Sequence, residues 1–398
     1  MVVWIQNPFD NLPSEGYRKQ RYWLMCEAFA RAGWKVVFWT SDFSHAKKKH
    51  RSLEGSGGLE GLDVRLIPTI PYPKNVCLAR IRSHRAYAEE WMRIVRSLPG
   101  FPGIPNLPSL IVSSSPTLSS AVAALEIGRA LGSKVVVDVM DAWPETFERL
   151  APKGLRWLTK PFLVGMCRTA RRIYREADHV TGVCERYRNL TGRADYYLAY
   201  HGIELTGDEG REKVNRGWFA GSTRKIRLVY AGNLGKTYDL ATVVKAVEAN
   251  VDFELDVAGF GEFACDCPRV RFHGLLPGRD LQTLLEQCDV GIVPMRPDSW
   301  VGVPYKFCDY SQAGLSLVSS LGGESSALLE KDRCGVTYHA GDEASLAAAI
   351  RKTMTLKRGA SRMMCAAEFD AVRIYDDYVR FVAEDVPWRG KAIHLAGC

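Results

Sequence analysis

Short apolar runs alternate along the chain with longer segments in which apolar residues recur at helical spacing. In the first half, Tyr22, Leu24, Met25, Ala28 and Phe29 follow a helical period that stops at Gly33. Continuous apolar runs predict buried strands, because a strand covered on both faces needs no polar alternation. The predicted strands of this half are residues 2–6, 36–40, 110–113 and 135–140, and a second helix is predicted over 117–131.

The same alternation resumes after a polar, glycine-bearing stretch. It predicts strands at 226–231, 253–258, 270–273, 290–294 and 315–319, and helices over 240–249, 280–288, 306–313 and 345–354. Strands that alternate with helices indicate parallel sheets covered on both faces. We therefore predict an α/β protein with two doubly wound, Rossmann-like domains that face each other across a cleft. The predicted boundaries are 1–205, a linker at 206–225, a domain at 226–368, and a C-terminal helix within 369–398 that can cross back to the first domain.

Composition narrows the class of protein. The 398 residues carry 53 Lys and Arg against 45 Asp and Glu, and 46% are hydrophobic, which excludes a disordered or collagenous chain. No run of about 18 apolar residues predicts a membrane-spanning helix. The chain starts on a strand-like segment without a basic and apolar leader, and its 11 cysteines are scattered, so we expect a cytoplasmic protein. The net charge of +8 suits a partner that carries phosphates but does not demand nucleic acid.

Metal chemistry has little support in the sequence. Cys265 and Cys267 form the one close cysteine pair, and their spacing is not a common zinc pattern. No Asp-x-Asp pair stands out as a site for a divalent cation. We therefore predict neither a metal nor a resident cofactor.

A series of short motifs follows the strands of the second half. In order they are Gly232-Asn-Leu-Gly-Lys236, Gly259-Phe-Gly261, His273-Gly274-Leu-Leu276, Val303-Pro-Tyr-Lys306-Phe-Cys-Asp309, and Gly322-Gly-Glu324. The first half adds Glu15-Gly16, Asp138-Val-Met-Asp141-Ala-Trp-Pro-Glu145 and His201-Gly-Ile-Glu204. This order and spacing resembles family 4 glycosyltransferases of the GT-B fold, over nearly all of the second domain. The Asp-x-Trp-Pro-Glu stretch is similar to the branch that builds bacterial surface polysaccharides.

The resemblance implies a nucleotide-diphosphate sugar donor of the UDP or GDP type, whose charge must be neutralised as the sugar–phosphate bond breaks. Backbone amides of Gly232 and Asn233 and the ammonium of Lys236 can converge on a phosphate there, although a strand-ending turn with a solvated lysine fits the same residues. Lys306 stands in the first turn of a helix, where a cation opposes the helix dipole, and a nearby anion would account for it.

Other donor-side roles also come from the resemblance. Asp309 takes the place of a glutamate that holds the ribose hydroxyls, and Gly274, Leu276 and Tyr305 belong to the nucleotide-binding loops. Glu324 matches an acidic position near the donor sugar. Val301 occupies the place of a second family glutamate, so the usual contact from that glutamate to the donor sugar is lost or replaced.

In the first domain, Gly16 lets the backbone approach the diphosphate or the acceptor. Asp141 ends a strand where relatives carry a catalytic histidine, and it fits a catalytic role or a turn-capping role equally. Glu145 can accompany it, whereas Trp143 and Pro144 are expected to be packing and turn residues.

Arginines 168, 171, 172 and 175 recur at helical spacing and form one cationic face beside an apolar stretch. Pro161 is expected to start a new helix there. Such a face fits an anionic membrane, and it fits an ordinary solvated helix equally well.

We thus predict a glycosyltransferase that moves a sugar from a nucleotide-diphosphate sugar to a hydroxyl of a glycan or lipid-linked glycan. The resemblance implies that it retains the anomeric configuration, works without a metal, and serves cell-surface polysaccharide biosynthesis, with possible peripheral membrane contact. A sugar-nucleotide epimerase and a catalytically degenerate sugar-nucleotide-binding module fit the same architecture.

Overall fold

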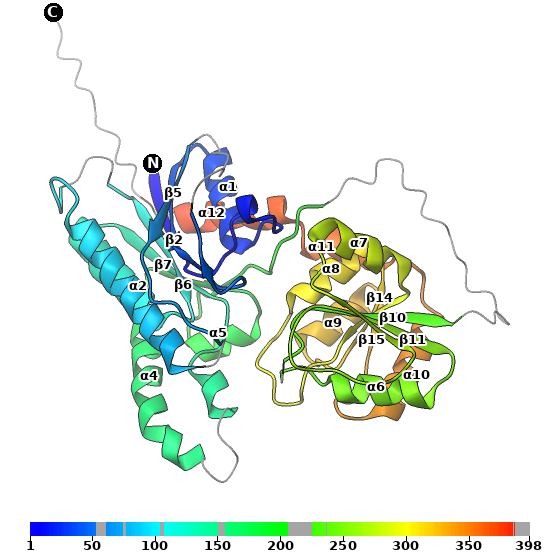
Figure 1. Cartoon of the computed structure of the whole chain (residues 1–398). Helices are drawn as coiled ribbons and strands as arrows, with labels where there is room; N and C mark the ends of the chain where they lie inside the picture. Colours follow the sequence, from blue (N-terminus) through cyan, green and yellow to red (C-terminus); the bar gives the residue numbers. More distant parts are fainter. Residues whose placement is uncertain are drawn as a thin grey trace, which may run out of the picture. The chain divides into compact units, whose positions relative to one another are not determined.

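The computed structural model describes residues 1–52, 61–74, 77–103, 107–149, 156–205, 225–235, 237–384 and 386. It divides into two units: residues 1–199 with 372–398, and residues 200–371. Most of the linker predicted at 206–225 lies outside the described residues. Each unit is built on one parallel sheet with helices on both faces, so the predicted fold class is confirmed (Figure 1).

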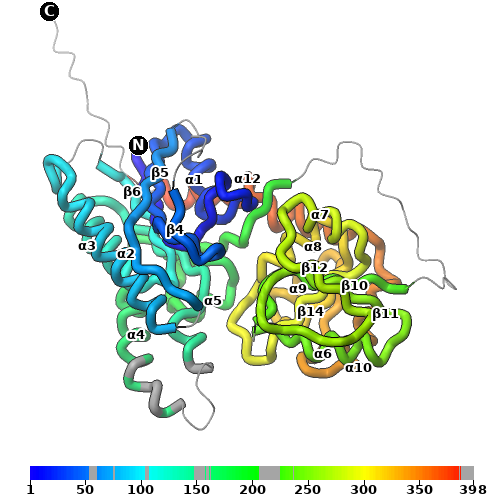
Figure 2. The backbone as a smooth tube through the Cα atoms, viewed as in Figure 1, coloured from blue at the N-terminus to red at the C-terminus, as the bar shows by residue number. Residues whose placement is uncertain are grey.

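The sheet of unit 1 has seven parallel strands in the order β5-β2-β1-β6-β7-β8-β9. Figure 2 shows α2 and α3 side by side against it, and these two helices pack on each other. The strands are β1 (Val2–Gln6), β2 (Lys35–Ser41), β5 (Leu62–Ile67), β6 (Leu110–Ser115), β7 (Lys134–Val139), β8 (His179–Gly182) and β9 (Tyr197–Leu198), with a separate hairpin of β3 (Phe43–Ser44) and β4 (Lys49–His50). The helices are α1 (Arg21–Arg31), α2 (Leu78–Arg96), α3 (Leu118–Leu131), α4 (Arg156–Glu176), α5 (Arg186–Thr191) and α12 (Ala371–Ala383), with 3-10 turns at Pro13–Glu15 and Glu145–Arg149.

The sheet of unit 2 has six parallel strands in the order β12-β11-β10-β13-β14-β15. The strands are β10 (Ile226–Ala231), β11 (Phe253–Ala258), β12 (Val270–Gly274), β13 (Val290–Val293), β14 (Ser316–Ser319) and β15 (Gly335–Thr337). The helices are α6 (Leu240–Ala249), α7 (Gly278–Gln287), α8 (Tyr305–Ala313), α9 (Glu324–Lys331), α10 (Glu343–Thr353) and α11 (Ser361–Glu368). One apolar core lies on each face: α6 and α10 cover one, and α7, α8 and α11 cover the other.

Each sheet reverses its strand order at one point, between β1 and β6 in unit 1 and between β10 and β13 in unit 2. In doubly wound sheets, ligands bind outside the carboxyl ends of the strands at such a point. The fold alone therefore directs attention to the loops after β1 and β10.

The course of helix α4 differs from the sequence prediction at Pro161. Pro161 does not start a new helix but lies inside α4, which runs unbroken from Arg156 to Glu176. A proline this close to the helix start removes one early backbone hydrogen bond, which the packing of the buried Ala170, Ile173 and Tyr174 compensates. None of the helices in the described ranges combines the length and hydropathy needed to span a bilayer.

A buried ion pair organises unit 1. Arg21 donates from Nε and Nη2 to the two carboxylate oxygens of Asp138, each at 2.8 Å, and from Nη1 to the carbonyl of Ala199. Tyr22 and Thr181 also donate to Asp138, so α1, β7 and β8 meet at one carboxylate. Burial raises the pKa of Asp138, but the Arg21 charge and these hydrogen bonds outweigh it and hold the pKa below its usual range.

We expect Arg21→Met to destabilise unit 1 by about 3–5 kcal/mol, because it leaves the Asp138 carboxylate buried without its cation. The matched control is Arg31→Met, which removes an exposed ion pair with Asp376 and should change stability by about 1 kcal/mol or less. Denaturant unfolding followed by tryptophan fluorescence measures both.

The pH dependence of this loss has a definite sign. A carboxyl whose folded pKa lies below its unfolded value stabilises the fold above the unfolded pKa of about 3.9, and the gain disappears as the pH falls through the folded pKa. The difference in unfolding free energy between wild type and Arg21→Met should therefore be largest at neutral pH and become smaller in acid. Equal stability of the two proteins at pH 7 contradicts the assignment.

Candidate functional site

Three glycine turns lie side by side at the carboxyl edge of the unit 2 sheet. Gly232 follows β10, Gly259 follows β11, and Gly274 ends β12. The Gly232 amide donates to the Ala258 carbonyl at 2.8 Å, and the Gly259 amide donates to the Gly274 carbonyl at 2.7 Å. A Cβ at Gly259, whose φ is +146°, would lie 1.8 Å from the Gly232 carbonyl oxygen. Only glycine lets these backbones come so close.

Lys306 brings a cation to the first of these turns. Its side chain is buried, and its ammonium lies 4.7 Å from the ring centroid of Tyr230 and 4.4 Å from that of Tyr238. A Cβ at Gly232 would stand 2.3 Å from Nζ, so the missing side chain makes room for the ammonium. Within the described residues, Lys306 forms no hydrogen bond or ion pair. A buried cation that faces only π systems and a glycine turn is placed to receive an anion.

Helix α8 presents further candidates beside this cation. It starts at Tyr305 behind Pro304, so the positive end of its dipole lies with Lys306 next to the strand-order reversal. Tyr305 stacks on His201 with ring centroids 3.8 Å apart. Asp309 is half-buried one turn further along.

Glu324 opens α9, the helix that follows β14. Tyr200 donates to its Oε1 at 2.6 Å, and the Tyr200 ring packs edge-on against Phe369. Ser325 donates to the carbonyl of Gly302 at 2.6 Å, which ties the start of α9 to the loop before α8. The two helix N-termini and the Glu324 carboxylate are thus held in fixed positions.

The segment predicted to receive the base ends β12. Gly274 has φ +67°, and Leu276 is half-buried against the core under α8. Asp256 on β11 anchors this edge, because Arg227, Arg271 and His273 all contact its carboxylate. Burial raises the pKa of Asp256, but hydrogen bonds led by Arg271 hold it below its usual range.

Two predicted residues belong to unit 1. Gly16 ends the 3-10 turn at Pro13–Glu15 with φ +84°, a conformation that favours glycine. Asp141 follows β7, and burial raises its pKa, with the Arg80 charge opposing the rise. The Arg80 guanidinium lies 4.9 Å from the ring centroid of Trp143 and 5.0 Å from that of Phe9.

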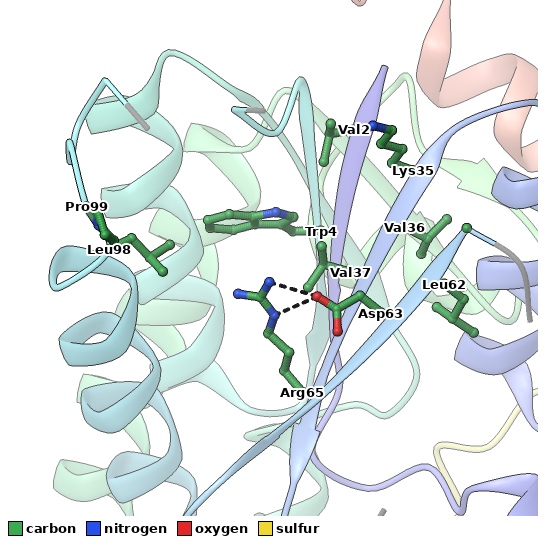
Figure 3. A pocket seen from close by; sticks show the side chains of 11 residues that line it. Val2, Trp4, Lys35, Val36, Val37, Leu62, Asp63, Arg65, Leu98 and Pro99 are labelled. Atoms are coloured by element: carbon green, nitrogen blue, oxygen red, sulfur yellow. Dashed lines mark hydrogen bonds and ion pairs between the residues drawn. The ribbon is translucent and has the colours of Figure 1, made fainter. Parts of the chain in front are cut away.

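A hollow of about 620 Å³ also opens on unit 1 (Figure 3). Val2, Lys35 and Leu62, which begin or nearly begin β1, β2 and β5, line it together with Trp4 and Leu98. It lies at the amino ends of the strands, the edge opposite the one where ligands of such sheets bind. We do not assign it to the site.

The structure thus brings Gly232, Asn233, Lys306 and the α8 N-terminus together, and it places Asp309 and Glu324 on the successive helices α8 and α9. Lys236 lies outside the described residues. In the same described part of the chain, no group of three or more His, Cys, Asp or Glu side chains is arranged to hold a metal ion. The sequence reasoning missed the Tyr230 and Tyr238 rings, Tyr200, and the aromatic setting of Arg80. A tyrosine in an otherwise apolar strand was the available signal for Tyr230.

Residues 225–355 match the model of the family described as glycosyl transferases group 1. The match lies within unit 2, so this unit is similar in sequence to group 1 glycosyl transferases. No curated protein matches the chain in sequence. Among solved structures, sucrose-phosphate synthase from Thermosynechococcus elongatus is similar at a TM-score of 0.69 and 13% identity, over 96% of this chain and 98% of that one.

Two further solved structures have a similar fold. Anabaena HepE in complex with UDP-glucose is similar at a TM-score of 0.64 and 13% identity, over 96% of this chain and all of that one. The lipopolysaccharide outer core galactosyltransferase WaaB is similar at 0.61 and 10%, over 96% and 99%. These matches confirm the GT-B fold for the enzyme.

We expect Gly232→Ala to weaken binding of inorganic pyrophosphate by roughly 10- to 100-fold. The new methyl group displaces the Lys306 ammonium, and losing one charged hydrogen bond costs about 1.5–3 kcal/mol. The control is Gly278→Ala, because a Cβ there meets no atom within 4 Å. Calorimetric titration with pyrophosphate measures both, and unchanged affinity in Gly232→Ala refutes the expectation.

Proposed function

We propose that this enzyme transfers a glycosyl group from a nucleotide-diphosphate sugar to a hydroxyl of a glycan or glycolipid. The observation that carries the proposal is the buried Lys306 ammonium beside the Gly232 turn, at the strand-order reversal of the unit 2 sheet. Breaking the sugar–phosphate bond leaves a diphosphate, and a preorganised cation with helix N-terminal amides stabilises that charge without reorganising at the moment of reaction.

Each donor-side residue takes a role in this proposal. Lys306 and the amides of Gly232 and Asn233 hold the diphosphate, and Lys236 of the same motif adds a second cation. Asp309 accepts the hydrogen bonds of the ribose diol, with main-chain groups around Gly274 and Leu276 at the base and Tyr305 beside them. Glu324, held by Tyr200, faces the sugar. Asp141 of unit 1 attends the acceptor hydroxyl, with Gly16 shaping the backbone near it.

A uridine nucleotide is the donor we favour, because structures of the similar fold in HepE contain UDP or UDP-glucose. The reaction we propose retains the anomeric configuration and uses no metal, with the leaving diphosphate helping to deprotonate the acceptor. We place it in surface-polysaccharide biosynthesis at the cytoplasmic face of the membrane. The name of the similar WaaB, a lipopolysaccharide galactosyltransferase, supports that setting.

We expect Lys306→Ala to lower turnover by roughly 10²–10³-fold, the usual loss when one preorganised donor to a developing negative charge is removed. The matched control is Lys245→Ala, an exposed lysine on α6 whose loss should leave turnover unchanged. Release of UDP from UDP-sugars, with and without an acceptor panel, measures the rate. Near-wild-type turnover in Lys306→Ala overturns the proposal.

The nucleotide of the donor is identified by measuring the melting temperature of the protein with each of a set of nucleoside diphosphates. A ligand present at 100 times its Kd stabilises the protein by about 2.7 kcal/mol. If no nucleoside diphosphate stabilises the wild-type chain, the result contradicts a nucleotide-sugar donor.

We further propose that α4 contacts an anionic membrane. Arg168, Arg171, Arg172 and Arg175 are all exposed on one face, and in the part of the chain that the structure describes none of them forms an ion pair. Trp157 of the same helix is 64% exposed. Exposed aromatic and guanidinium groups on one helix suit the headgroup region of a bilayer.

Replacing these four arginines with glutamine should abolish co-flotation with anionic liposomes at low salt, because each cation near the surface contributes about 1 kcal/mol. The control replaces four exposed cations of unit 2 with glutamine: Lys245, Arg279, Lys352 and Lys357. Flotation of wild type that does not depend on anionic lipid contradicts this part of the proposal.

A further inference from the structure

Tyr230 contacts both the cation and the glycine turn of the candidate site in unit 2. It is the last residue but one of β10, and its side chain is fully buried. The centroid of its ring lies 4.7 Å from the Lys306 ammonium, and its hydroxyl donates to the carbonyl of Asn233. The ring therefore acts on the charge and the hydroxyl acts on the backbone, so the two contributions can be tested separately.

The Tyr230 hydroxyl helps to fix one peptide group of the turn. The Leu234 amide, at one end of the peptide between Asn233 and Leu234, donates to the Phe260 carbonyl at 2.8 Å. The Asn233 carbonyl, at the other end of the same peptide, accepts from Tyr230. A peptide group is planar, so a hydrogen bond at each end fixes its orientation.

The amide of Asn233 lies between two fixed peptide groups. Before it, the Gly232 amide donates to the Ala258 carbonyl at 2.8 Å, and after it comes the peptide that Tyr230 holds. The Gly232 carbonyl oxygen lies 1.8 Å from the place of a Cβ at Gly259. Because the carbonyl and the amide of one trans peptide point in opposite directions, the Asn233 amide points away from Gly259. Among the residues that the structure describes, this amide has no hydrogen-bond partner.

The Tyr230 hydroxyl keeps its proton. Burial raises its pKa well above the ordinary value, and the neighbouring Tyr238 and Tyr310 add to the rise. A neutral phenol donates to the Asn233 carbonyl and places no negative charge next to an incoming anion. The hydrogen bond that holds the turn is therefore present at any pH at which the protein is folded and active.

We propose that Tyr230 is a positioning residue of the diphosphate site. Its hydroxyl fixes the peptide after Asn233 and so keeps the Asn233 amide directed away from Gly259, on the turn against which the Lys306 ammonium lies. The inference rests on the proposed function, since the anion concerned is the leaving diphosphate. Tyr230 does not bind this anion itself. A donor that is already held in place stabilises the anion without the cost of ordering the turn on binding.

The test removes the hydroxyl and keeps the ring. We expect Tyr230→Phe to weaken binding of inorganic pyrophosphate to the full chain by roughly 2- to 10-fold, the effect of losing one neutral hydrogen bond. Calorimetric titration well below the melting temperature of each variant measures the affinity. Pyrophosphate affinity that is unchanged in Tyr230→Phe overturns the proposal.

The matched control is Tyr87→Phe. Tyr87 is another fully buried tyrosine, and its hydroxyl donates to the Trp39 carbonyl of unit 1 at 2.9 Å. Its loss should lower the melting temperature and leave pyrophosphate affinity unchanged. A general effect of removing a buried tyrosine hydroxyl would instead weaken binding equally in the two variants, and that result contradicts the proposal.

Amide hydrogen exchange distinguishes positioning from a purely structural role. Pyrophosphate should slow exchange of the Asn233 amide in the wild type, because the anion becomes its hydrogen-bond partner. At equal saturation it should slow this exchange less in Tyr230→Phe. Equal protection of the amide in the two proteins would mean that Tyr230 only stabilises the fold.

The variant Lys306→Ala separates the inference from the proposed function on which it rests. If Lys306→Ala weakens pyrophosphate binding and Tyr230→Phe does not, only the positioning role is wrong. If neither variant weakens binding, the diphosphate site of the proposed function is wrong, and the inference falls with it. If Tyr230→Phe alone weakens binding, the turn binds an anion without Lys306, which contradicts the proposed function and keeps the role of Tyr230.

Discussion

The close approach of two backbones at the carboxyl edge of unit 2 is the constraint on which the candidate site depends. The Gly232 carbonyl oxygen occupies the space where a side chain at residue 259 would begin. That approach bends the chain after β10 and leaves room above Gly232 for the Lys306 side chain. Any larger residue at either glycine moves a backbone or the ammonium, so the turn and the cation are a single structural unit.

Burial of Lys306 at this edge is unfavourable by itself and has to be offset. A lysine in the first turn of a helix opposes the helix dipole, and burial adds a desolvation penalty. The Tyr230 and Tyr238 rings offset part of this penalty through their π faces. A bound anion offsets the rest of the desolvation penalty of Lys306. The ammonium therefore stabilises a leaving phosphate, whose charge grows during the reaction, more than it stabilises the intact donor.

The sequence was sufficient for the fold because buried parallel strands are continuous apolar runs and their helices keep a helical period. The apolar pattern did not predict β5 and α2, because Arg65 and a row of arginines interrupt the apolar positions there. It also predicted a new helix at Pro161, because the preference of proline for a helix start takes no account of how α4 packs on the core. For the site, glycine and lysine positions were predicted from motifs. The ring contacts of Lys306 and Arg80 were not, since they join residues more than sixty positions apart.

Buried charge in this molecule takes two forms, and the contrast separates structure from binding. Arg21 and Asp138 are fully buried and satisfy each other, with Tyr22, Thr181 and the Ala199 carbonyl completing the network. Such a network has no capacity left for a ligand. Lys306 instead lies against the aromatic faces of Tyr230 and Tyr238, and in the described part of the chain its ammonium forms no hydrogen bond or ion pair. An aromatic ring stabilises a cation without neutralising it. A cation held against rings therefore keeps a positive potential that can attract an anion.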